Sequence, residues 1–186
     1  TMRCIGRIAF PVFAFLIAEG FIHTRSRYRY FFTLLGFAII SEIPWYLLNG
    51  ADGTHNVMFT LALGVATLMV LENLLQRSPI QGFLWTLGMA GIASWLGVDY
   101  EWRGMLLIVI LYLFNRYGHS FPYSKGMQFF CTFTLMMYYG ITGILLAHFV
   151  ISSYDGTRGF IHSMLAKYGF YTIYPIHIIV LVFFLL

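Results

Sequence analysis

The chain has 186 residues, of which 60% are hydrophobic and only 10% are charged, and its mean hydropathy is +0.78. A soluble domain carries about a quarter charged residues, so the composition excludes an ordinary soluble fold and indicates an integral membrane protein. The pI near 9.1 is typical of the basic loops of a membrane protein, and nucleic-acid binding is not expected.

Seven apolar runs predict an all-α fold, a polytopic bundle of transmembrane helices at about 20 residues per crossing. The expected helices cover residues 5–22, 30–48, 57–75, 80–96, 104–116, 129–151 and 170–186. The fifth run is short for a crossing and would need flanking aromatic residues to complete one. No internal repeat and no linker stands out, so one membrane domain over residues 1–186 is expected.

The basic residues of the short loops predict the orientation, because cytoplasmic loops carry an excess of Lys and Arg. The first, third and fifth loops hold Arg25, Arg27, Arg29, Arg77, Arg116 and Lys125. We therefore expect these loops in the cytoplasm, and the loops with Arg103, Arg158 and Lys167 outside. This orientation places Thr1 outside, and one more helix upstream would return the N-terminus to the cytoplasm.

Ionisable side chains interrupt the apolar runs at Arg7, Glu19, Glu42, His148 and His177. Such a group at the centre of a membrane helix costs about 2.5–3.5 kcal/mol on insertion scales. Because lipid penalises them, several together predict a polar cavity inside the bundle.

Glu42 precedes Pro44, which bends a helix and frees backbone carbonyls. Its carboxylate is interpreted either as a group that orients a catalytic base or pairs with Arg7, or as half of a structural ion pair. His55 and Asn56 open the next predicted helix. They are suited to general-base work or to stabilising an oxyanion, whereas helix capping by Thr54 or Asn56 is the structural alternative.

His177 lies in an apolar run after Tyr174 and Pro175. It is expected either to accept a proton from a substrate or to hydrogen-bond a neighbouring helix. With the predicted orientation it lies in the outer third of its helix.

The loops predicted to be outside mix charged and aromatic residues, among them Asp99, Tyr100, Arg103 and Arg158. They are interpreted either as the mouth through which a substrate enters or as ordinary solvated turns.

Arg25, Arg27 and Arg29 have two interpretations. They are topology determinants, or they clamp the phosphates of a cytoplasmic donor, since guanidinium groups fit phosphate geometry. The six histidines show no HxxxH or HxxE spacing, so no metal centre is expected. The sequence also lacks the P-loop, GxGxxG and GxSxG motifs, which disfavours nucleotide hydrolysis and serine esterase chemistry.

Several stretches in order along the chain resemble the TraX family of conjugal-transfer proteins. They are residues 7–20 with the Thr24-Arg25 loop, 40–45, 55–60, Asp99-Tyr100 with Gly104, and 167–177. The TraX family is similar to the acyltransferase-3 superfamily of integral membrane acyltransferases, and its namesake is linked to N-terminal acetylation of conjugative pilin. Two departures are visible: this chain begins after the family's first helix, which bears an Asp-His pair, and Thr33 stands where members tend to have Arg.

The resemblance implies acetyl transfer from acetyl-CoA to an amine or hydroxyl acceptor at the bacterial cytoplasmic (inner) membrane. Acetyl-CoA would be the donor substrate, bound near Arg25, Arg27 and Arg29, and the acceptor a pilin-like peptide, a glycan or a small amine. The implied catalytic residues are His177, Glu42, Asn56 and Arg7, with His177 as base and Arg7 or Asn56 at the oxyanion. The implied substrate-binding residues are His55, Asp99, Tyr100, Arg103, Arg158 and Tyr174.

Two other functions fit the same pattern. Intramembrane charges and kinked helices also occur along the path of a transporter or channel. A non-catalytic assembly factor of a conjugation or surface-appendage system would bind a protein partner and no acyl donor.

Overall fold

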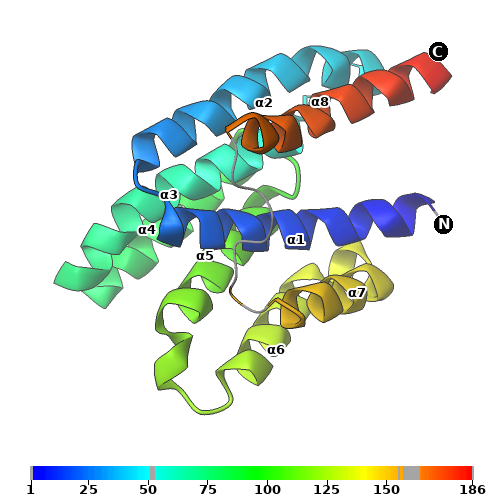
Figure 1. Cartoon of the computed structure of the whole chain (residues 1–186). Coiled ribbons are helices and arrows are strands. Elements are labelled where there is room, and N and C mark those ends of the chain that lie inside the picture. The colour runs from blue at the N-terminus through cyan, green and yellow to red at the C-terminus, as the bar shows by residue number, and fades with distance from the viewer. Residues whose placement is uncertain (1, 51–52, 155, 157–163, 186) are drawn as a thin grey trace.

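The computed structural model describes residues 2–50, 53–154, 156 and 164–185, without the side chains of residues 2–7, 119, 164–167, 170 and 185. In this part of the chain all regular structure is helical, which confirms the all-α class (Figure 1). The helices are α1 Met2–His23, α2 Arg27–Asn49, α3 Val57–Arg77, α4 Pro79–Trp95, α5 Glu101–Tyr117, α6 Ser124–Met136, α7 Ile141–Ser152 and α8 Met164–Leu185. Two 3-10 turns, η1 at Gly118–Ser120 and η2 at Met137–Tyr139, flank α6.

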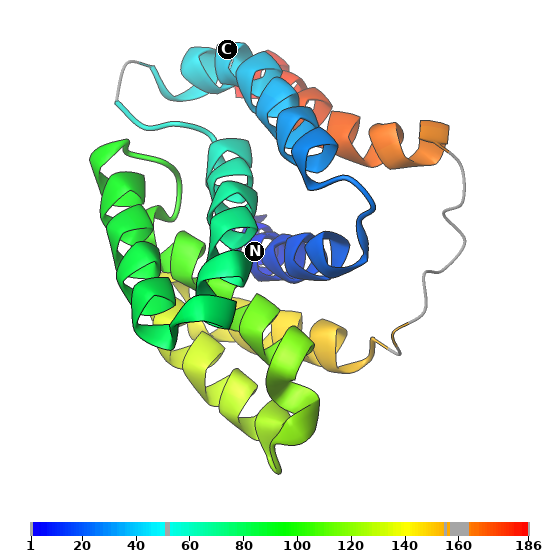
Figure 2. The ribbon, with the colours of Figure 1, turned by 90° about the vertical axis from the view of Figure 1, so that its left-hand side faces the viewer.

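Helices α1 to α5 begin and end within a few residues of the predicted runs, and they alternate in direction along the bundle (Figures 1 and 2). We call the end at residues 24–26 the arginine end, and the end at residues 53–56 and 96–100 the His55 end. Helices α2 and α3, of 23 and 21 residues, are long and apolar enough to cross a membrane by length and composition. Many large apolar side chains of the described residues are exposed, as a lipid-facing surface requires.

Close packing of α1, α3 and α5 forms the centre of the bundle and depends on two glycines. A Cβ on Gly64 of α3 would lie 2.5 Å from a side-chain carbon of Ile108 on α5. A Cβ on Gly104 of α5 would lie 2.9 Å from the ring of Phe10 and 3.0 Å from Thr60. Small residues let helix backbones approach closely, and at Gly104 this approach brings α1, α3 and α5 together beside the His55 end.

The prediction of one continuous membrane-crossing helix over residues 129–151 is wrong, because the helix is interrupted at η2 and Gly140. Gly140 has φ +134°, a conformation that favours glycine. The Phe129 ring of α6 lies 4.6 Å from the His148 ring of α7, and Thr132 is 3.3 Å from Nε2 of His148. Thr132 and His148 are equally far from Gly140 along the chain, so α6 and α7 form an antiparallel hairpin.

The hairpin is too short to cross a membrane. Helices α6 and α7 have 13 and 12 residues, or about 20 and 18 Å at 1.5 Å per residue, against about 30 Å of hydrocarbon. The chain therefore enters from the arginine end, turns near the His55 end and runs back.

The hairpin reverses the predicted direction of α8. Tyr171 hydrogen-bonds Tyr30 in the first turns of α2 and lies 5.5 Å from Phe37, whereas Tyr174 reaches Val57 at the His55 end. Helix α8 thus runs in the same direction as α2 (Figure 1). The expectation that the last helix begins at the end opposite the first loop is wrong, because it counted the hairpin as one crossing.

This arrangement places the basic residues more unevenly than the predicted topology did. Most basic residues belong to the arginine end: Arg25, Arg27, Arg29, Arg77, Arg116, Lys125 and, in the first turn of α8, Lys167. Among described side chains, Arg103 is the basic one at the His55 end. The excess of Lys and Arg therefore predicts that the arginine end faces the cytoplasm.

The hairpin predicts that α8 begins at the arginine end. In a cysteine-free background, single cysteines at the exposed Tyr168, one turn before Tyr171, and at Arg25 should react with a membrane-impermeant maleimide from the same side, and a cysteine at Thr54 from the opposite side. Labelling of Tyr168→Cys together with Thr54→Cys in sealed vesicles would contradict the hairpin.

Candidate functional site

The side chain of Glu42 joins α2 to the segment that leads into α3. Its Oε1 lies 2.5 Å from Nδ1 of His55, and its Oε2 accepts hydrogen bonds from the backbone and side-chain amides of Asn56 at 3.3 and 2.6 Å. The side chains of His55 and Glu42 are 45% and 31% exposed, so the pair is reachable from outside the bundle. A carboxylate that binds one nitrogen of an imidazole orients the ring and leaves the other nitrogen available to a ligand.

The side chain of Asn56 makes structural contacts with both its oxygen and its nitrogen. Its Oδ1 accepts the backbone N–H of Met58 at 3.0 Å and so caps α3, a role that the structural alternative gave to Thr54 or Asn56. Its Nδ2 donates to the backbone oxygen of Ala38 and to Glu42. The side chain is fully buried with both amide hydrogens engaged, so it has none left for an oxyanion.

The α4–α5 loop holds the backbone of His55 on both sides. The N–H of His55 donates to the oxygen of Gly97 at 2.9 Å, and the N–H of Asp99 donates to the oxygen of His55 at 3.0 Å. Gly97 has φ +64°, and a Cβ there would lie 2.7 Å from the backbone oxygen of Gly53. Glycine is therefore required at this contact between the two loops.

Asp99 lies at the centre of the same loop with its carboxylate mostly buried. Its Oδ1 accepts the N–H of Tyr100 at 2.9 Å, and its backbone oxygen accepts the hydroxyl of Thr60 from α3. Burial raises the pKa of the Asp99 carboxyl from 3.8 to about 6, and the bond from Tyr100 opposes this increase.

Tyr100 connects this loop to α1 and to the hairpin. Its ring stacks on Phe10 at 3.8 Å and lies 4.8 Å from the ring of Tyr139 in η2. Tyr100 and Glu101 both have positive φ, 63° and 45°, a strained conformation for non-glycine residues. The strain is held by the Phe10 contact and by the close packing at Gly104.

Tyr174 is the residue of α8 that reaches the site. Its hydroxyl hydrogen-bonds the backbone of Val57, and the residue lies within electrostatic range of Asp99, Glu42 and Tyr100. The structure thus brings the predicted residues Glu42, His55, Asp99, Tyr100 and Tyr174 together at the His55 end.

The structure does not bring His177 to this group. Tyr174, Pro175 and Ile178 are at least partly buried, whereas the His177 side chain is exposed between them. The backbone of Arg7 lies in α1, but its side chain is outside the described residues, as is all of Arg158. Their predicted roles stay predictions.

The three arginines of the first loop are not equivalent. Arg27 forms an ion pair with Glu72 of α3, and its guanidinium lies 4.8 Å from the centre of the Phe21 ring. This pair joins α2 to α3 and gives Arg27 a structural partner, so its predicted role as a phosphate ligand stays a prediction. Arg25 and Arg29 are exposed and remain candidates for binding a donor.

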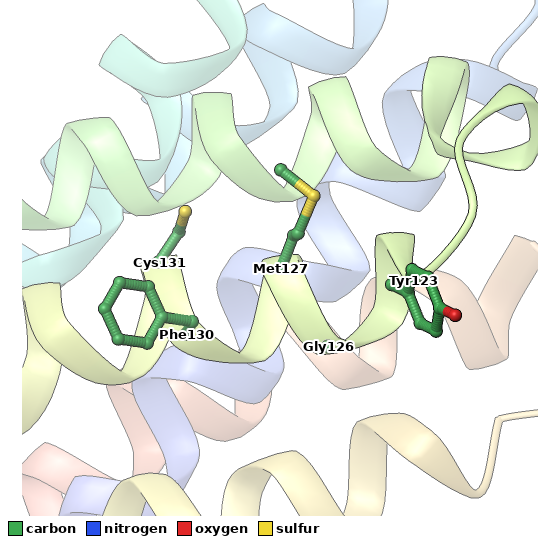
Figure 3. A pocket seen from close by; sticks show the side chains of 5 residues that line it. All are labelled: Tyr123, Gly126, Met127, Phe130 and Cys131. Carbon is green, nitrogen blue, oxygen red and sulfur yellow. The ribbon is translucent and has the colours of Figure 1, made fainter.

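An apolar groove of about 290 Å³ lies on α6, lined by Tyr123, Gly126, Met127, Phe130 and Cys131 (Figure 3). It contains none of the predicted site residues. In the described residues, no group of three or more metal-binding side chains occurs.

A model of the family described as TraX protein matches residues 1–185. The chain belongs to the TraX family. It is also similar to a protein of Dichelobacter nodosus named "Probable fimbrial assembly protein FimC, serogroup H1". The two sequences are 27% identical over 210 residues, and the alignment covers 97% of this chain and 81% of that protein. No solved structure matches the chain.

The buried carboxylate predicts a pH dependence of stability for this TraX-family protein. Because the pKa of Asp99 is raised on folding, the unfolded chain loses this proton first as the pH rises from about 4 to about 6, and stability falls over that interval. Asp99→Asn should lack this decrease. Melting temperatures of both proteins between pH 4 and 7 test the prediction, and parallel curves would contradict it.

Proposed function

We propose that this TraX-family protein is a membrane acyltransferase of a pilus or conjugation system, with His55 as the general base. The observation that carries the proposal is the 2.5 Å contact between Glu42 and Nδ1 of His55 in a partly exposed site. The family assignment and the name of the Dichelobacter nodosus relative support the connection to pili.

The geometry indicates how the pair would act. In the tautomer whose Nδ1 donates to Glu42, Nε2 of His55 carries a free lone pair. Nε2 takes the proton from the amine or hydroxyl of the acceptor as this nucleophile bonds the acetyl carbon. The C–S bond of the thioester then breaks, and the CoA thiolate leaves and takes up a proton. In this proposal His55 replaces His177 as the base.

The donor is proposed to be acetyl-CoA, with Arg25 and Arg29 as its phosphate ligands at the arginine end. Glu42 lies thirteen positions after Arg29 on α2, or about 20 Å along the helix at 1.5 Å per residue. The acyl group would therefore cross much of the bundle before it meets His55. The acceptor would be a pilin-like peptide, a glycan or a small amine that enters at the His55 end, outside the cytoplasmic membrane.

The second candidate is a non-catalytic assembly factor. The name of the Dichelobacter nodosus relative favours it. The contacts of Asn56 favour it as well, because they leave no free amide hydrogen to stabilise an oxyanion where one was expected. An assembly factor would use the His55 end as a binding surface only.

The test measures release of CoA thiol from acetyl-CoA by the purified protein in nanodiscs, with glycinamide as a probe acceptor. His55→Ala and Glu42→Gln should lower the rate about a hundredfold or more, the usual contribution of a general base. His177→Ala distinguishes the two predicted bases and should retain the rate. His23→Ala, at an exposed histidine of the arginine end, is the matched control.

A wild-type rate of CoA release by folded His55→Ala would contradict His55 as the proposed base. A loss of CoA release in His177→Ala alone would contradict it as well. Absence of CoA release from the well-folded wild type, together with stable capture of a pilus subunit, would favour the assembly factor.

A further inference from the structure

Arg103 of α5 is fixed in place by three aromatic side chains. Its guanidinium carbon lies 4.5 Å from the centre of the Trp102 ring and 4.7 Å from the centre of the Tyr138 ring. The guanidinium group also donates a hydrogen bond to the side chain of Tyr139. The break between α6 and α7 supplies both tyrosines. Stacking on aromatic rings orients the planar group while its N–H edges stay free to donate.

This oriented cation has no ion-pair partner among the described residues. The described acidic side chains lie beyond ion-pair distance of Arg103, in contrast to Arg27 with Glu72. Glu101 and Asp99 lie in the same region, since both act electrostatically on Tyr139. Neither pairs with Arg103, because Glu101 is exposed to solvent and the carboxylate of Asp99 accepts the N–H of Tyr100. A guanidinium fork held in one orientation matches a carboxylate through two parallel hydrogen bonds.

The position of Arg103 connects it to the Glu42–His55 pair. Tyr139, its hydrogen-bond partner, lies 4.8 Å from the ring of Tyr100, and Tyr100 follows Asp99, whose N–H donates to the oxygen of His55. Arg103 and the Glu42–His55 pair therefore belong to one connected group of residues at the His55 end. Tyr138 is 75% exposed and offers an apolar face beside the bound group.

We propose that Arg103, with Tyr138 and Tyr139, binds a carboxylate of the molecule that the protein receives at its His55 end. The carboxylate belongs to an acidic side chain of a peptide or to a uronic acid of a glycan, since the same fork serves both. This site sets which molecule is received, whether the protein then transfers an acyl group to it or only binds it.

The experiment measures binding and requires no transfer activity. Wild-type protein in nanodiscs is titrated with two dye-labelled probe pairs by fluorescence polarisation. The first pair consists of two hexapeptides that differ only at the central residue, Glu in one and Gln in the other. The second pair consists of a glucuronide, which carries a carboxylate, and the matching glucoside, which does not. The carboxylate member of one pair should bind about tenfold more tightly, as a charge-assisted hydrogen bond provides, and that pair identifies the source.

Variants then assign the preference to Arg103. Arg103→Gln should abolish it, and Arg103→Lys should reduce it to about threefold or less, because the ammonium keeps the charge without the fork or the stacking. Tyr138→Ala should also weaken it by freeing the guanidinium. Arg116→Gln, which removes one exposed positive charge at the arginine end, is the matched control and should retain the preference.

Equal affinities within both probe pairs would overturn the proposal. So would a preference that survives in folded Arg103→Gln, or one that Arg116→Gln lowers as much, since either result would show general charge attraction. Because no step depends on acetyl-CoA, a failure here is distinct from a failure of the proposed acyl transfer.

Discussion

The carboxylate of Glu42 is the interaction on which the His55 end depends. It lies on α2 and bonds the imidazole of His55 and two N–H groups of Asn56. A partly buried carboxylate is costly without such partners. The partners are fixed in turn, since Asn56 caps α3 and His55 pairs with residues 97 and 99 of the α4–α5 loop. One charged group thereby links α2, the start of α3 and the α4–α5 loop.

The rest of the site is arranged around this link by close packing. Gly104 allows Phe10, Thr60 and Tyr100 to meet, and Gly97 allows the two loops to touch. Tyr139 reaches Tyr100 because the chain breaks at η2 and Gly140. The hairpin therefore completes the His55 end even though it does not cross the bundle, in the way that broken helices form sites in other membrane proteins.

Much of this could be predicted from the sequence, and the misses have physical causes. Helices α1 to α5 follow from hydropathy, and Glu42, His55 and Asp99 follow from polar groups at one end of those helices. The hairpin could not be predicted in this way, because residues 129–151 form an apolar run as long as a crossing, and glycines such as Gly140 also occur inside membrane helices. That one miss reversed α8. The structural contacts of Arg27 and Asn56 could not be predicted either, because Glu72 and Ala38, their partners, come from distant positions in the sequence.

The central claim is that Glu42 holds His55 with Nδ1 protonated and Nε2 free. The most direct test is nitrogen-15 NMR of the histidine-labelled protein in nanodiscs at a pH where His55 is neutral, with the His55 signals assigned by their absence in His55→Gln. The account predicts the Nδ1–H tautomer in the wild type and its loss in Glu42→Gln. A dominant Nε2–H tautomer, or signals that do not change in Glu42→Gln, would contradict it.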